Sequence, residues 1–364
     1  MNNPVNDAPL TLRDVAAAAG VSLATADRVV NGRPGVSAKT ARKVHEAVQR
    51  LGFRPLAAAA ELARARSWRF AVILPRGSNR FMMDIADNVR AQAGWFRARR
   101  IAVEIVETDL FDPDRLAAEL AGLAGRFDGV AVVALDHPRI RAAIDDLVAG
   151  GMAVVTLVSD APSSRRQHYV GIDNIAAGRT AGSLVGRFLC GPWGPAHAVK
   201  MGGQMGGQTG GAVGIVTGSA SLRDHAERRF GFGQVLAEEY PQLTLLPPVE
   251  GRDDPERNRE LVRRMLADTP GLMAIYNTGE GSVGIGEALA EAGLARRILC
   301  IGHELTPATR RMLLDGTVAA LVAQDPGHEA RSMARVLHAL VTGQEIVAAQ
   351  EHIRVQVILR DNLP

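Results

Sequence analysis

The spacing of hydrophobic residues along this chain changes near residue 69. From there onward, short continuous runs of apolar and β-branched residues alternate with stretches in which apolar residues recur every three or four positions. Continuous runs are typical of parallel strands covered on both faces, and helical spacing between them predicts crossover helices. The pattern predicts an α/β body of two parallel-sheet lobes. The runs that predict strands are RFAVILP, IAVEIVE, DGVAVVAL, MAVVTLV, AVGIVTG, LMAIYN and RILCIG.

The residues before this body predict three short helices. Thr11 and Asp14 form a capping-box start, and the helix that they open ends at Gly20. Ser22 caps a second helix, LATADRVVN, and Ser37 caps a third, AKTARKVHEAVQRLGF. Two short helices joined by a tight turn and supported by a third make a helix-turn-helix. We therefore expect an all-α helix-turn-helix head.

The second predicted helix directs its N-terminal end away from the small core of the head. In a helix-turn-helix this end enters the major groove, where an arginine donates to the edge of a guanine. Arg28 is the candidate for that contact. The predicted DNA-binding residues of the head are Thr11, Ser22, Leu23, Ala24, Thr25, Arg28 and Asn31.

The charge distribution fits a nucleic-acid partner. Residues 1–69 hold 11 Lys and Arg against 5 Asp and Glu, a balance of +6, whereas the whole chain carries +3, so the other 295 residues carry −3. Neutralisation of phosphates supplies much of the affinity of proteins for DNA. A basic head on a mildly acidic body is what such a contact needs. Charge alone leaves a solvated basic surface as an equal alternative.

The length of 364 residues suggests two or three domains. Composition favours a soluble cytoplasmic protein. Cys190 and Cys300 lie far apart, which fits neither a disulfide framework nor a zinc site. The N-terminus lacks the basic and apolar segments of a signal peptide, and no run of about 18 apolar residues predicts a membrane span. No metal or other cofactor is expected.

The stretch from Thr11 to Pro55 resembles the DNA-binding head of the lac/gal repressor family of bacterial transcriptional regulators. The resemblance runs over the whole stretch almost without gaps, which makes it more specific than a generic helix-turn-helix. The motifs that carry it are Asp14-Val15-Ala16, Ala19-Gly20-Val21-Ser22, Arg28-Val29 and Val36-Ser37.

The same resemblance implies a hinge helix after the head, which folds on the operator. Leu62 matches the leucine that family members push into the minor groove, and Ala59 lies three residues earlier. Leu56 departs from the family, which usually has asparagine there. An ordinary short helix or linker is the alternative for this segment.

The body resembles the type I periplasmic sugar-binding fold that family members carry behind the head. The resemblance implies two lobes with a ligand between them. The expected boundaries are residues 1–54 for the helix-turn-helix head, 55–68 for the hinge helix and linker, 69–172 plus 324–345 for the N-terminal lobe, 173–323 for the C-terminal lobe, and 346–364 for a C-terminal strand and tail.

Ligands of open α/β sheets gather at the carboxyl ends of the strands, so the loops there are candidates for an effector site. The resemblance places Arg228 where a family arginine holds ligand hydroxyls, and Asn277 where a family asparagine binds the ligand. Glu304 stands where the family generally has aspartate, which leaves the ligand open. The predicted effector-binding residues are Asn79, Phe81, Asp224, Arg228, Asn277, Glu304 and Gln324.

Each of these positions also has a structural alternative. Asp224 and Arg228 can form an exposed pair one helical turn apart, and Asn277 can satisfy the polar groups of a strand end. His303 and Glu304 can close a loop. Aspartates after strands often cap helices, and this applies to three others, Asp109, Asp160 and Asp173.

Enzymatic chemistry is not expected, because the chain has no G-x-S-x-G, no H-E-x-x-H and no paired cysteine motif. The glycine-rich residues 191–211 match neither a P-loop nor a dinucleotide-binding motif, and we predict a surface loop there.

These features predict a sequence-specific DNA-binding transcriptional regulator that represses as a homodimer and responds to a sugar or sugar-like effector between its lobes. One alternative is a corepressor-dependent or activating regulator with a non-sugar effector. Alternatives of another class are a sugar-processing enzyme and a transport-type binding protein. The last would need an export signal and no basic head.

Overall fold

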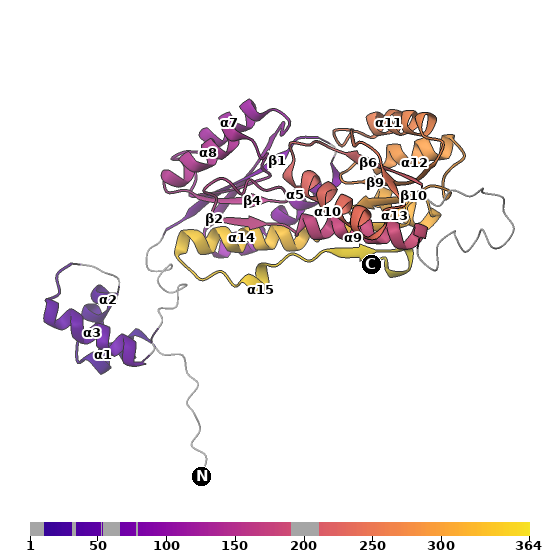
Figure 1. Ribbon diagram of the computed structural model, residues 1–364. Helices are drawn as coiled ribbons and strands as arrows, with labels where there is room; N and C mark the ends of the chain where they lie inside the picture. Colours follow the sequence, from indigo (N-terminus) through magenta and orange to yellow (C-terminus); the bar gives the residue numbers. More distant parts are fainter. Residues whose placement is uncertain (1–10, 31–33, 52, 54–65, 78, 191–210) are drawn as a thin grey trace, which may run out of the picture. The chain divides into compact units, whose positions relative to one another are not determined.

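The computed structural model describes residues 11–30, 34–51, 53, 66–77, 79–190 and 211–364. The chain divides between residues 66 and 67 into two compact units, which we call the head and the body (Figure 1). Each is described by itself below. The all-α head and the α/β body with parallel sheets confirm the predicted fold class.

The head consists of three helices around a small apolar core. Both the N–H and the hydroxyl of Thr11 donate to Asp14 Oδ2 at 2.7 Å, which caps the first helix. That helix ends at Gly20, whose φ of 64° favours glycine. The helices are α1 (Leu12–Ala19), α2 (Leu23–Val30) and α3 (Ala38–Leu51). The buried apolar residues between them are Val15, Ala16, Ala26, Val29, Val44, Ala47 and Phe53.

The first sheet of the body has the strand order β2-β1-β3-β4-β5, and its described strands all run parallel. Figure 1 shows α7 and α8 over one face of this sheet and α14 over the other. Coverage of both faces explains the continuous apolar runs. The elements are β1 (Trp68–Pro75), α5 (Arg80–Ala91), α6 (Ala93–Ala98), β2 (Ile101–Thr108), α7 (Pro113–Ala121), β3 (Gly129–Val132), α8 (Pro138–Ala149), β4 (Ala153–Leu157), β5 (His168–Val170) and α14 (Pro326–Thr342).

The second sheet has the order β12-β11-β10-β9-β6-β7, and β8 also pairs with β6. Among its described strands only β12 is antiparallel to its neighbour. The elements are α9 (Asn174–Cys190), β6 (Ala212–Thr217), α10 (Arg223–Glu239), β7 (Thr244–Leu245), β8 (Val249–Glu250), α11 (Pro255–Asp268), β9 (Leu272–Asn277), α12 (Ser282–Glu291), β10 (Leu299–His303), α13 (Pro307–Asp315), β11 (Ala320–Ala323), α15 (Ala348–Glu351) and β12 (Gln356–Ile358).

Within the described residues the chain passes between the two sheets at three places: between β5 and α9, between β11 and α14, and between α14 and β12. Helix α14 packs on α5, β3 and β4 of the first sheet, although it follows a strand of the second. We therefore keep residues 69–172 plus 324–345 and residues 173–323 as the proposed lobes. The strand β12 adds part of the proposed tail, 346–364, to the second sheet.

Two glycines allow α9 and α10 to pack with their backbones in contact. A Cβ on Gly178 would lie 1.9 Å from the carbonyl oxygen of Arg228, and one on Gly231 would lie 2.2 Å from the carbonyl oxygen of Ile175. Such distances exclude any side chain. This close packing brings the start of α9 beside the buried face of α10, where the site described next begins.

Candidate functional site

The N-terminal end of α2 forms the exposed surface of the head that a helix-turn-helix uses. Leu23 is 43% exposed, although it is apolar, and Ala24 and Arg28 are exposed beside it. Ser22 Oγ accepts the backbone N–H of Thr25 at 3.1 Å and lies 2.8 Å from Thr25 Oγ1, so the side chain of Ser22 caps α2. Of the predicted DNA-binding residues, Asn31, Ala59 and Leu62 lie outside the described residues, as does most of the glycine-rich segment.

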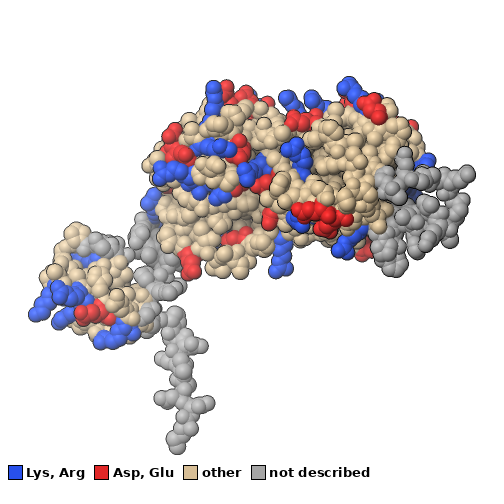
Figure 2. Space-filling view, in the orientation of Figure 1, with Lys and Arg blue, Asp and Glu red and all other residues tan. Residues whose placement is uncertain are grey.

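The head is basic over the face that Figure 2 shows, where Lys and Arg side chains outnumber acidic ones. Its described residues carry seven Lys and Arg against three Asp and Glu. Arg50 also donates to the carbonyl of Ala18 at 3.1 Å and so ties α3 to α1. The arrangement presents positive charge together with one exposed helix end, which is what phosphate contacts and groove contacts require.

A cavity of about 190 Å³ lies in the body, between loops that follow strands of both sheets. It is lined by six of the seven predicted effector residues: Asn79, Phe81, Asp224, Arg228, Glu304 and Gln324. Phe81 and Leu110 supply buried apolar surface from the first sheet, and Asn79 caps α5 by accepting the N–H of Met82 at 3.2 Å. The carboxyl ends of the two sheets therefore face one shared cavity.

Arg228 is the buried cation of this cavity. Its Nε donates to Asn174 Oδ1 and its Nη1 to the carbonyl oxygen of Thr278, both at 2.8 Å. Its Nη2 lies 3.9 Å from Glu304 Oε1 and has no hydrogen-bond partner among the described residues. Two bonds thus hold the guanidinium rigidly while one nitrogen is available to a ligand.

Glu304 and Gln324 form the wall beside this arginine. Gln324 donates to Glu304 twice, through its side-chain Nε2 at 2.9 Å and its backbone N–H at 3.2 Å. Burial raises the pKa of Glu304 to about 7, although Arg228 and the two bonds from Gln324 act to lower it. Within the described part of the body, Gln324 Oε1 has no hydrogen-bond partner.

Asp224 and His225 lie at the start of α10 and are both buried. Asp224 Oδ2 is 3.6 Å from His225 Nε2, and His225 Nδ1 accepts the N–H of Ser219 at 3.3 Å. The other oxygen of Asp224, Oδ1, lacks a hydrogen-bond partner in the described structure. Buried polar atoms are nearly always bonded in folded proteins, so these unbonded atoms are available to a ligand in the cavity.

Strained backbone gathers at the same cavity. Among the described residues, six other than glycine have positive φ, and four of them line the cavity: Val158, Arg252, Asp253 and Glu304. The φ of 62° at Val158 is unfavourable because its side chain branches at Cβ. Such strain clusters at ligand sites, where the surrounding structure maintains it.

Asn277 does not line the cavity. Its amide nitrogen donates to the carbonyl oxygens of Gly279 and Glu280 and to Ser282 Oγ, at 2.9 to 3.1 Å. It therefore shapes the loop after β9. These contacts fit the alternative role given above for Asn277, which is to satisfy the polar groups of a strand end. Likewise His303 bonds Tyr276 through Nε2 at 2.8 Å, and burial lowers its pKa well below 6.5.

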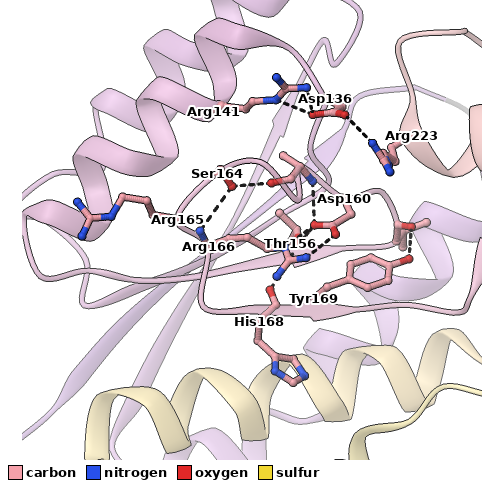
Figure 3. A network of polar contacts seen from close by, with 12 residues as sticks. Asp136, Arg141, Thr156, Asp160, Ser164, Arg165, Arg166, His168, Tyr169 and Arg223 are labelled. Carbon is pink, nitrogen blue, oxygen red and sulfur yellow. Dashed lines mark hydrogen bonds and ion pairs between the residues drawn. The ribbon is translucent and has the colours of Figure 1, made fainter.

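The other aspartates after strands also make local contacts. Asp160 forms a two-bond ion pair with Arg166 at 2.5 and 2.6 Å, as Figure 3 shows. Asp109 accepts the N–H of Phe111, and Asp173 accepts that of Ala176. The cavity residues that the sequence did not indicate include Ser159, His225, Asp253 and Glu280. Asp253 follows β8, which is too short to show a strand pattern.

In the described structure, no group of three His, Cys, Asp or Glu could hold a metal ion. A search of the same residues finds no helix with the length and apolar character needed to cross a membrane.

Comparison with known families agrees with this division into head and body. Residues 11–55 match the family described as bacterial regulatory proteins, lacI family, and residues 70–345 match the periplasmic binding protein domain. The chain belongs to the lacI family of bacterial regulatory proteins. Its body is a periplasmic binding protein domain.

Relatives of this LacI-family chain match it over limited lengths. Catabolite control protein A from Priestia megaterium is 42% identical over 88 residues, which cover 24% of this chain and 26% of that protein. Its counterpart from Streptococcus mutans is 35% identical over 103 residues, which cover 28% and 31%. The chain thus matches only about a quarter to a third of the length of these relatives.

Solved structures resemble the body in fold. The glucose-galactose binding protein GanP from Geobacillus stearothermophilus superposes with a TM-score of 0.69 at 22% identity, covering 82% of this chain and 99% of that one. A solute binding protein from Burkholderia graminis in complex with D-arabinose gives 0.69 at 22% identity, covering 82% and 97%. At such identities the similarity establishes the fold alone.

Proposed function

We propose that this LacI-family chain is a sequence-specific transcriptional regulator whose operator affinity is switched by a sugar or sugar-like effector bound in the cavity of the body. We propose repression as its mode, and a cytoplasmic homodimer on a pseudo-palindromic operator as its active form. One observation carries the proposal. A single chain joins a basic head with an exposed recognition helix to a cavity lined by buried, unbonded polar atoms.

The DNA-binding part of the proposal rests on α2. Its first turn exposes Leu23 and Ala24, and Arg28 follows on the exposed side. Leucine and alanine contact the methyl group of thymine, and arginine donates two bonds to guanine. The surrounding Lys and Arg residues supply phosphate contacts, which makes the binding sensitive to salt.

The effector part rests on the size and chemistry of the cavity. About 190 Å³ lies below the range of drug-sized ligand sites, so a small ligand fits. The wall combines the apolar Phe81 with polar atoms of Arg228, Asp224 and Gln324. Sugars present this mixture, with hydroxyls around the ring and apolar C–H groups on its faces. The structural neighbours named for glucose, galactose and arabinose support the same class.

The switch follows from the position of the cavity. A ligand there touches residues carried by both sheets, so it binds best at one separation of the two halves of the body. Any change in operator affinity that accompanies this arrangement must be matched by an equal change in effector affinity. This equality follows from binding free energies alone and does not depend on how the head and the body communicate.

Fluorescence anisotropy of purified protein with DNA from upstream of its own gene tests the proposal, in the presence and absence of a panel of sugars. We expect tight, salt-sensitive binding that one class of compound changes. Arg28→Ala should weaken operator binding by about tenfold or more. Arg97→Ala, which removes an exposed arginine of the body, is the matched control and should leave it unchanged. Equal affinity for operator and scrambled DNA would contradict the proposal.

A further inference from the structure

The charges of the cavity are strongly unequal. Among its described lining residues, the buried and half-buried charged groups are one guanidinium, of Arg228, and four carboxylates, of Asp224, Asp253, Glu280 and Glu304. Three further charged residues of the lining are exposed, Arg76, Arg252 and Asp254, and water screens them. The protein therefore presents a cluster of negative charge to any ligand in the cavity.

The arginines offer little to an anionic ligand. Arg228 is bonded through Nε and Nη1, and its remaining nitrogen already faces Glu304 at 3.9 Å. Arg76 donates to the carbonyl oxygen of Glu107 at 3.2 Å. A phosphate or carboxylate placed beside Arg228 would also stand near the carboxylates of the same wall, which repel it.

Two of the buried polar atoms that lack a partner among the described residues of this cavity are acceptors. Asp224 Oδ1 and Gln324 Oε1 belong to side chains that are more than nine-tenths buried, and the described structure gives neither atom a hydrogen-bond partner. Arg228 Nη2 is an unbonded donor beside them, and the hydroxyl of Ser159, which lines the cavity without a described partner, can donate or accept. A ligand that satisfies this wall must therefore donate hydrogen bonds to Asp224 and Gln324 and also accept from Arg228.

Asp253 and Glu280 both line the cavity, and the carboxylate of Asp253 bonds the backbone of Glu280. The N–H of Glu280 donates to Asp253 Oδ1 at 3.0 Å. Gly218 and Gly279 lie against the Asp253 carboxylate. A Cβ on either glycine would lie within 2.5 Å of Asp253 Oδ1, so neither position has room for a side chain. Burial, and to a smaller extent the charge of Asp253, raise the pKa of Glu280 to about 7. A cation beside the pair would relieve this repulsion.

We propose that the cavity selects a monosaccharide that carries a protonated amino group, over its neutral and anionic counterparts. The ammonium supplies three donors and a positive charge to the carboxylate cluster, and the ring hydroxyls bond Arg228 and Gln324. The inference rests on the proposed effector role of the cavity and specifies the chemical class of the effector.

Isothermal titration calorimetry of the full chain with matched sugars tests the proposal at about pH 7, where the amines are still largely protonated and Glu280 and Glu304, with pKa values of about 7, are partly ionised. The pairs are D-glucosamine with D-glucose, D-galactosamine with D-galactose, and D-mannosamine with D-mannose. We expect at least one amino sugar to bind about tenfold or more tightly than its parent. The N-acetyl derivative should lose this advantage, and glucose 6-phosphate should not bind.

Variants that replace a carboxylate by an amide show which residues give the preference for amino sugars. Glu280→Gln and Asp253→Asn should each reduce the ratio of parent to amino-sugar Kd, because they remove charge and keep volume. Asp268→Asn, at the exposed end of α11, is the control and should keep the ratio. In the unmodified protein, added salt should reduce the same ratio.

The outcomes separate this inference from the proposed function. Parent sugars that bind as tightly as the amino sugars, and that change operator binding, would overturn the inference and leave the regulator proposal intact. Tightest binding of glucose 6-phosphate would overturn it as well. Operator binding that no sugar of any charge alters would remove the sugar effector itself, and with it this inference.

Discussion

Arg228 combines a buried charge with a fixed orientation. The oxygen of Asn174 and the carbonyl of Thr278 hold two of its nitrogens, and the third points to the wall made by Glu304 and Gln324. An arginine held in this way loses little side-chain entropy when a ligand binds. A lysine at the same place would keep the charge and lose the planar fork.

Arg228→Lys should therefore weaken effector binding by about tenfold or more, because hydrogen bonds to a charged group contribute about 1.5 to 3 kcal/mol. Titration calorimetry with the effector found in the sugar panel measures the change. Arg229→Lys is the matched control, since the neighbouring arginine is exposed and does not line the cavity. Wild-type affinity in Arg228→Lys would show that the guanidinium does not contact the effector.

Glu304 should make the stability of the body depend on pH. Its pKa is raised from 4.5 to about 7 in the folded protein, so the folded state binds more protons than the unfolded state between these values. The free energy of unfolding must then fall as pH rises through this range, by about 3 kcal/mol for this group.

Urea unfolding of the full chain at several pH values tests this linkage. Relative to wild type, Glu304→Gln should gain stability between about pH 4.5 and 7. The exposed Glu239→Gln serves as control and should follow the wild-type curve. Parallel curves for Glu304→Gln and wild type would mean that the carboxyl titrates alike in both states.

The sequence indicates six of the residues that line the cavity, because strand ends can be located from apolar runs. Arg228 and Asp224 were identified one helical turn apart, and the structure places both at the cavity. Asn277 was also expected there, but its amide is used by the adjacent loop. The carboxylates of Asp253 and Glu280 could not be predicted, since their proximity depends on how two loops pack across the sheet.

Among the helices and strands, the packing of α9 on α10 determines the position of Arg228 in the cavity. Gly178→Ala should destabilise the body by about 1 to 3 kcal/mol or more, because its Cβ would collide with the Arg228 carbonyl. Gly94→Ala in α6 is a matched control, since no atom lies within 4 Å of its added Cβ. That control should be neutral or stabilising. Thermal unfolding of both variants checks the expectation, and equal destabilisation would contradict it.

An ion pair joins the two halves of the body outside the cavity. Arg223 at the start of α10 reaches Asp136 of the first sheet at 3.1 Å, and Asp136 also pairs with Arg141 of α8 (Figure 3). The pair forms only while the halves hold this separation. It should therefore favour the arrangement seen in this structure, in which residues from both halves line the cavity.

Arg223→Ala should raise the effector Kd by about two- to fivefold, since partly exposed ion pairs contribute up to about 1 kcal/mol. Arg139→Ala removes a pair with Asp114 that lies within the first half alone and should have no such effect. Calorimetry of both variants distinguishes a bridge between halves from a surface pair. An unchanged Kd in Arg223→Ala would show that the Arg223–Asp136 ion pair does not contribute to effector binding.

The elements themselves were largely predictable. Capping residues and apolar spacing gave the three helices of the head, and continuous apolar runs gave the long strands of both sheets. The short strands β7 and β8 have two residues each, too few for a periodic pattern. The antiparallel pairing of β12 with β11 could not be deduced either, because it depends on the path of the chain after α14.

Across the full chain, the proposed switch couples a DNA-binding head to a ligand-binding body through thermodynamic linkage. If the effector changes operator affinity by some factor, the operator must change effector affinity by the same factor. This relation holds whatever the path by which the two units communicate, and it separates a true switch from two independent binding activities in one chain.

The most direct test is therefore to measure both sides of this relation on the same protein. Anisotropy gives the operator Kd with and without saturating effector, and calorimetry gives the effector Kd with and without saturating operator. We expect a change of about 5- to 150-fold in each Kd, equal within error. An operator Kd that stays the same at saturating effector would show that the effector does not switch DNA binding.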